Sequence, residues 1–177
     1  GSIQVRHPNN PDLKTAVNNS VVTIKRGREI RLKYKIGEER LYNRNFPGRK
    51  DVVLWDVLPI KEGQKIKIKF LRNNTTYRQG IRIAVDVGAG ELEINGVKNR
   101  VMELWDDTAP SAVLCVCNAK AGKISIYNVW DERGYSESQL DSSGMIVEEE
   151  ETKRIYHCND FGFKTNFDKF LFSVEML

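Results

Sequence analysis

Acidic and amide side chains near the C-terminus have residue types and a spacing that could bind a metal ion. Asn159 and Asp160 come first, a loop with Gly162 and aromatic residues follows, and Asp168 comes just before an alternating apolar segment. Calcium takes about six to eight oxygen ligands, which carboxylates and backbone carbonyls of such loops can supply. Asn, Asp and Gly also bend chains between strands. The stretch therefore predicts either a calcium site that holds a binding loop or a plain turn.

The elements that must position this loop are β-strands. Residues 59–73 read "PIKEGQKIKIKFLRN", a Gly-centred turn followed by strict alternation of apolar and basic residues, and residues 23–37 repeat the pattern. Such alternation indicates half-buried strands with one face toward a core and one toward water. Turn-forming residues recur at intervals of about ten residues, and helical periodicity is missing. Further strands are expected over 80–87, 92–96, 113–118, 123–130, 145–149, 154–159 and 170–176.

These patterns predict an all-β fold. The expected architecture is a two-sheet antiparallel sandwich of jelly-roll type, because short strands with regularly spaced turns are typical of sandwiches and barrels. A length of 177 residues suits a single core. We expect a flexible N-terminal arm over residues 1–19 and one β-sandwich domain over residues 20–177. The connections at 105–110, 130–136 and 159–168 should form the functional end of the domain.

The charge is distributed unevenly along the chain. The formal net charge is +4, with the basic residues concentrated in residues 1–90 and the acidic ones in the rest. A basic half can engage a protein, or a polyanion such as nucleic acid or an anionic glycan. The same lysines and arginines are also explained as the solvated faces of strands. An exposed edge strand could equally pair two copies into a homodimer.

The cysteines offer a second candidate metal site. In a strand, Cys115 and Cys117 share a face, and with His157 and Cys158 they could bind zinc. The close Cys-x-x-Cys spacing of zinc sites is missing, however, and "AVLCVCNA" reads as a core strand.

No catalytic motif is found. The chain has two histidines and lacks a nucleophile elbow, a phosphate-binding loop and a His-Glu-x-x-His pattern, so we expect no enzyme. No apolar run is long enough to span a membrane as a helix. The cellular compartment stays open.

Aromatic residues favour a sugar ligand. Carbohydrate sites set a ring against the apolar face of a sugar and orient its hydroxyls with carboxylates and amides. Trp55, Trp105 and Trp130 lie in apolar runs and are expected in the core. Phe161 and Phe163 lie in a Gly-containing loop, where two rings are hard to bury together and could form an exposed platform.

The C-terminal stretch resembles that of the bacterial galactophilic lectins and related calcium-dependent jelly-roll modules. In that family a strand ends in Asn-Asp, a Gly-containing loop follows, an acidic or amide position comes about eight residues later, and a Phe-Ser-Val strand closes the chain. Asn159, Asp160, Gly162, Asp168 and the segment 172–174 match this layout. The segment 52–70 resembles an early strand pair of the same modules.

The resemblance implies that Asp160 and Asp168 bind calcium and that the surrounding loop binds sugar hydroxyls. Lys164 and Phe167 stand where that family has oxygen-bearing ligands, and Lys169 adds a positive charge beside the ion.

The function expected from the sequence is non-catalytic carbohydrate binding, assisted by calcium. Asp160 and Asp168 would hold the metal or sugar hydroxyls, Asn159 would support them, and Phe161 or Phe163 would pack on the ligand. The alternative is a module that binds a protein or a polyanion such as nucleic acid through its basic N-terminal half.

Overall fold

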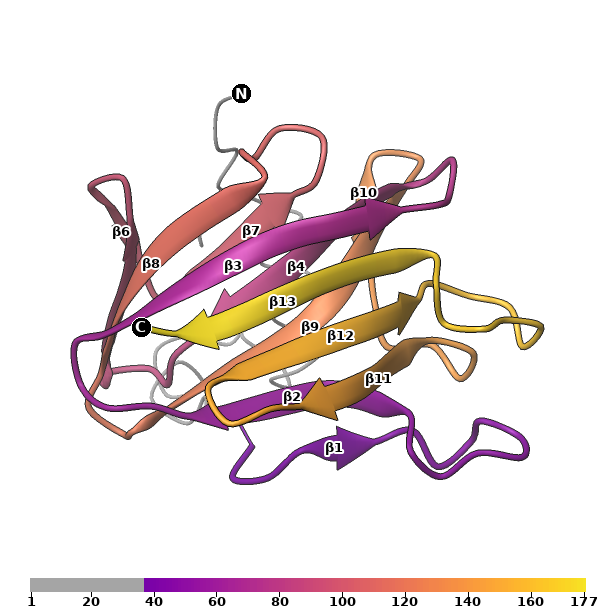
Figure 1. The fold of residues 1–177 in the computed structure, drawn as a ribbon, viewed down its shortest axis with the longest axis horizontal. Helices are drawn as coiled ribbons and strands as arrows, with labels where there is room; N and C mark the ends of the chain where they lie inside the picture. The colour runs from indigo at the N-terminus through magenta and orange to yellow at the C-terminus, as the bar shows by residue number, and fades with distance from the viewer. Residues whose placement is uncertain (1–36) are drawn as a thin grey trace, which may run out of the picture.

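The computed structural model describes residues 37–177, which form an antiparallel β-structure without a helix (Figure 1). None of the described residues belongs to a helix long and apolar enough to cross a membrane. The expected arm at 1–19 and the alternating segment at 23–37 lie outside the described residues, apart from Gly37. The strands are β1 (Leu41–Tyr42), β2 (Val53–Pro59), β3 (Gln64–Asn73), β4 (Arg78–Ala84), β5 (Gly90–Ile94), β6 (Val97–Asn99), β7 (Val101–Trp105), β8 (Ala112–Ala119), β9 (Lys123–Glu132), β10 (Tyr135–Glu137), β11 (Gly144–Glu149), β12 (Lys153–Asn159) and β13 (Phe170–Met176).

The strands form one sheet that is nearly closed into a barrel. Its order is β6-β5-β8-β3-β13-β12-β11-β2-β9-β4-β7, with β1 beside β2 and β10 beside β9. The two ends of the sheet approach each other where β5 contacts β7. Strand β2 connects the part of the sheet from β6 to β11 with the part from β9 to β7. Its residue Val53 pairs with β11, and its segment from Asp56 to Pro59 pairs with β9. The all-β prediction is confirmed, whereas the division into two jelly-roll sheets stays a prediction.

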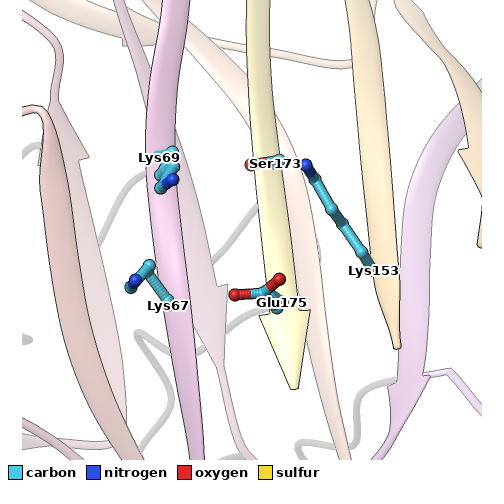
Figure 2. Close-up of a pocket in the computed structure, with 5 residues that line it drawn as sticks. All are labelled: Lys67, Lys69, Lys153, Ser173 and Glu175. Carbon is cyan, nitrogen blue, oxygen red and sulfur yellow. The ribbon is translucent and has the colours of Figure 1, made fainter. Parts of the chain in front are cut away.

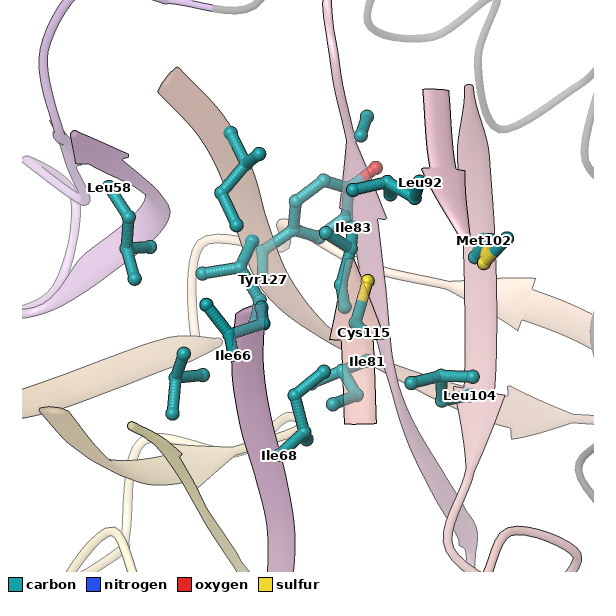
Figure 3. Packing of buried hydrophobic residues seen from close by; sticks show 14 of the residues in the cluster. Leu58, Ile66, Ile68, Ile81, Ile83, Leu92, Met102, Leu104, Cys115 and Tyr127 are labelled. Carbon is teal, nitrogen blue, oxygen red and sulfur yellow. The ribbon is translucent and has the colours of Figure 1, made fainter. Parts of the chain in front are cut away.

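The alternation read from the sequence places side chains as expected in β3. Ile66 and Ile68 are fully buried, and Figure 3 shows them in the core near Ile81 of β4. Lys65 and Lys69 on the same strand are exposed. Burying an aliphatic side chain of this size stabilises the fold by about 2 kcal/mol. The seven further strands expected from the sequence are all present, with ends shifted by a few residues.

Aromatic and cysteine side chains complete the core. Trp105 and Trp130 are fully buried and Trp55 nearly so, as the sequence predicts. The rings of Tyr156 and Phe172 stack with their centroids 4.6 Å apart. Cys115, Cys117 and Cys158 are buried free cysteines, so "AVLCVCNA" is the core strand β8. Among residues 37–177 no group of three or more His, Cys, Asp or Glu side chains could hold a metal ion.

A buried carboxylate on β2 connects the residue that precedes β1 with strand β12. Asp56 is inaccessible to solvent and accepts hydrogen bonds from Arg40 Nε at 2.8 Å and Arg154 Nη1 at 2.9 Å. The Tyr156 hydroxyl donates a third hydrogen bond to it at 2.7 Å. Two guanidinium groups and a hydroxyl therefore compensate the desolvation of this carboxylate, since a buried charge is tolerated when it is paired and hydrogen-bonded.

Candidate ligand-binding site

Four connections meet at one end of the sheet, which we call the loop end: residues 74–77, 106–111, 133–134 and 160–169. Asn73 Nδ2 donates to Asp106 Oδ2 at 3.3 Å, and Arg78 Nε donates to Asp107 Oδ1 at 2.7 Å. Arg78 also lies 3.8 Å from a carboxylate oxygen of Asp131. In Figure 1 the loop after β3 and the loop between β12 and β13 lie on the same, right-hand side. Asn74 Nδ2 donates to the backbone oxygen of Asp168, so the 105–110, 130–136 and 159–168 connections all border the β3–β4 connection, while their functional role stays a prediction.

Asp160 is buried at the start of the β12–β13 loop, with 1% of its surface exposed. Its Oδ1 accepts hydrogen bonds from Lys169 Nζ at 2.9 Å and from the backbone N–H of Phe161 at 2.6 Å. Its Oδ2 accepts one from Gln79 Nε2 at 3.1 Å. Both carboxylate oxygens are therefore engaged by protein donors, and the ammonium group of Lys169 neutralises the charge.

Asn159 holds neighbouring loops together. Its side-chain amide donates to the backbone oxygens of Ser142 at 2.6 Å and Gly162 at 3.0 Å. Its own backbone oxygen accepts a hydrogen bond from Asn128 Nδ2 at 3.1 Å. The side chain is fully buried, so its role here is to shape the loop that follows β12.

Asp168 is partly exposed at the far end of the same loop. Its backbone oxygen accepts a hydrogen bond from Asn74 Nδ2 at 3.0 Å, which ties this loop to the β3–β4 connection. The ammonium of Lys169 occupies the position beside Asp160 where a cation would bind. Both carboxylate oxygens of Asp160 already accept hydrogen bonds from protein groups, so this arrangement does not fit a calcium ion. Calcium at Asp160 and Asp168 stays a prediction of the sequence.

Phe161 belongs to an aromatic cluster at the loop end. Its ring meets that of Tyr77 edge-on with the centroids 5.1 Å apart, and the ring of Trp130 is 6.2 Å away. Lys169 Nζ lies 5.2 Å from the Phe161 centroid, within the range of a cation–π contact. Tyr77 remains 37% exposed, so it is the member of the cluster that offers a ring to solvent.

Phe163 belongs to a different cluster. It is 51% exposed, and its ring contacts that of Phe46 with the centroids 5.5 Å apart. Phe46 and Phe167 pack with Val52 in a small satellite core. The side chains of Phe161 and Phe163 thus have different partners, so these two residues do not make a joint platform.

Tyr77 and Arg78 were missed as candidates by the sequence analysis. Arg78 is held between Asp107 and the buried ring of Trp105, whose centroid lies 4.5 Å from its guanidinium carbon. Gly80 on the same strand makes room for this ring, since an added Cβ would lie 2.8 Å from Trp105 Cε3. The signal for Tyr77 was its position after "NNTT", a turn that leaves an aromatic residue at a strand start.

Comparisons with known proteins give little beyond the fold. No protein-family model and no curated protein matches the chain. One similar solved structure is the lectin CV2L of Chromobacterium violaceum in complex with α-methyl-fucoside. The TM-score is 0.39 with 10% identity, over 67% of this chain and 92% of that chain. The likeness is weak and concerns the fold alone.

Proposed function

We propose that the chain is a non-catalytic carbohydrate-binding module whose ligand contacts the loop end. The observation that carries the proposal is the exposed ring of Tyr77, which the edge-on contact with Phe161 holds in place. A pyranose has an apolar C–H face that packs on such a ring, and a ring fixed in advance loses little conformational entropy on binding.

Polar groups of the loop end would supply the second half of a sugar site. Asp107 is exposed, Asp106 and Asp131 are partly exposed, and their carboxylates can accept hydrogen bonds from sugar hydroxyls. Asn73 and Asn74 add exposed side-chain amides, which can both donate and accept. Hydrogen bonds to charged groups are the stronger kind, so the carboxylates would set the orientation of the sugar.

The five residues expected from the sequence take different parts in this proposal. Phe161 supports the ring of Tyr77, and Asn159 and Asp160 hold the loop. Asp168 fixes the loop to the β3–β4 connection through its backbone oxygen. Phe163 is not included, because its ring packs on Phe46. The proposal needs no calcium.

A glycan array tests the proposal. Fluorescently labelled protein is applied at low and at high salt, and the strongest neutral ligand is then titrated by calorimetry. We expect a neutral sugar to bind with an affinity that salt hardly changes, since few ions are released when an uncharged ligand binds. Binding to no neutral glycan would overturn the proposal.

A further inference from the structure

A hollow on the outer face of the sheet is built from three strands and gathers basic side chains from two of them. It is lined by Lys67 and Lys69 of β3, Lys153 of β12, and Ser173 and Glu175 of β13 (Figure 2). Figure 2 shows the two β3 lysines on one side of Ser173 and Glu175, and Lys153 on the other. The register explains the arrangement, because Ser173 pairs with Lys69 and Glu175 pairs with both Lys67 and Lys153.

Among the described residues, the charges that line the hollow are unequal in number. Three ammonium groups face a single carboxylate. Within residues 37–177, Lys67, Lys69 and Lys153 make no ion pair within 4.0 Å. Ser173 is 1% exposed and lies among these lysines with its hydroxyl available as a donor. An anion at the mouth of the hollow would meet an excess of positive charge, with a hydroxyl donor beneath it.

Apolar side chains border the hollow on both sides. Leu114 of β8 pairs with Lys67, and Ile155 of β12 pairs with Ser173. Leu114 is 59% exposed. Charge–charge attraction is stronger beside apolar groups than in open water, because the local dielectric constant is lower.

We propose that this hollow binds a sulfate ester of an acidic polysaccharide. Several point-like ammonium groups and a hydroxyl suit a tetrahedral oxyanion, whose oxygens point in several directions, whereas a planar carboxylate suits the fork of an arginine. The site is distinct from the loop end and does not depend on the proposed function.

The surrounding face favours a glycan over a nucleic acid. Proteins that bind single strands stack bases on exposed aromatic rings. The exposed large apolar side chains near this part of β3 and β8 are Leu71 and Leu114, neither of which is aromatic. Glu91 and Glu93 lie on β5, on the far side of β8, and limit the width of the basic region. Within the part of the chain that the structure describes, the basic strip is therefore narrow and has no exposed aromatic ring for stacking.

The test measures binding of a heparin tetrasaccharide, its fully desulfated counterpart and a single-stranded oligonucleotide by calorimetry at several salt concentrations. The variant K69Q/K153Q removes two charges from the hollow. The control K61Q/K120Q removes two charges from exposed turn positions. Tyr77→Ala serves as a second control, since it alters only the loop end.

We expect K69Q/K153Q to weaken binding of the sulfated tetrasaccharide by more than tenfold and to lower the salt slope by about two. The control K61Q/K120Q and Tyr77→Ala should change affinity by less than about threefold. Equal losses in the two double variants would overturn the site, because diffuse charge would then explain binding. Tight binding of the desulfated sugar, or equal affinity for the oligonucleotide, would overturn the assignment to sulfate esters of a glycan. Absence of binding to the sulfated sugar would overturn the proposal outright.

Discussion

The ammonium nitrogen of Lys169 lies 2.9 Å from Oδ1 of Asp160, and this pair joins the two ends of the β12–β13 loop. Lys169 also donates to the backbone oxygen of Phe161 at 2.7 Å. One side chain therefore neutralises the buried carboxylate and positions the residue that supports the ring of Tyr77. The loop is held by protein contacts at the place where the sequence predicts a metal ion.

Replacing Lys169 should destabilise the protein. Lys169→Met leaves Asp160 buried without its cation, and we expect the free energy of unfolding to fall by about 2–3 kcal/mol. This is less than for a fully buried pair, because 29% of the Lys169 side chain is exposed. Lys164→Met, an exposed change in the same loop, is the control. Urea denaturation measures both, and equal stability of the two variants would contradict the structural role of the pair.

Calcium should have little effect on the wild-type protein. Because Lys169 already compensates Asp160, we expect the melting temperature to be the same with excess calcium and with EDTA. A ligand that binds only the folded state would raise it. Thermal denaturation followed by circular dichroism gives the answer. A rise with calcium that Asp168→Ala abolishes would uphold the metal site expected from the sequence and contradict this prediction.

Asp56 should be among the most sensitive positions for stability. Asp56→Asn keeps the shape but removes the charge that Arg40 and Arg154 share, and we expect a loss of about 3 kcal/mol. Asp51→Asn breaks an exposed pair with Arg49 and should cost less than about 1 kcal/mol. Guanidinium denaturation compares the two. A loss at Asp56 no larger than at Asp51 would show that the buried cluster contributes little.

Stability should fall at alkaline pH. Burial raises the pKa of the Cys158 thiol well above its ordinary value of 9.0. Above about pH 9 the unfolded chain releases this proton while the folded chain keeps it, so the free energy of unfolding falls as pH rises. The loss is at most about 1.4 kcal/mol per pH unit for one such group.

Cys158→Ala isolates this contribution. The variant loses packing at every pH, but its stability should decline less steeply between about pH 9 and 10 than that of the wild type. Urea denaturation under reducing conditions at several pH values measures the slopes. Identical slopes would mean that the thiol does not titrate differently in the two states.

The strands could be predicted from the sequence because their signal is local. Alternation in β3 and the apolar run of β8 predict which side chains face the core. The closure of the sheet could not be predicted, because it depends on β2 pairing with β11 at one end and β9 at the other. Nothing in the sequence near Val53 marks this change of partner.

The candidate site could be predicted only in part for a similar reason. The Asn-Asp and Gly signals located the loop between β12 and β13, which contacts the β3–β4 connection, but whether this loop binds a ligand stays a prediction. The hydrogen bond from Gln79 to Asp160 spans 81 positions, so no spacing rule indicates it. Phe161 and Phe163 look equivalent in the sequence, yet their rings contact Tyr77 and Phe46 respectively.

The most direct test of the carbohydrate-binding proposal is a calorimetric titration of the best neutral glycan into wild type, Tyr77→Ala and Phe163→Ala. Both substitutions truncate an exposed ring, and only Tyr77 lies on Phe161. We predict that Tyr77→Ala weakens binding at least about tenfold, a loss of about 1.4 kcal/mol, and that Phe163→Ala leaves it unchanged. Full affinity in Tyr77→Ala, with or without a loss in Phe163→Ala, would contradict the placement of the sugar at Tyr77.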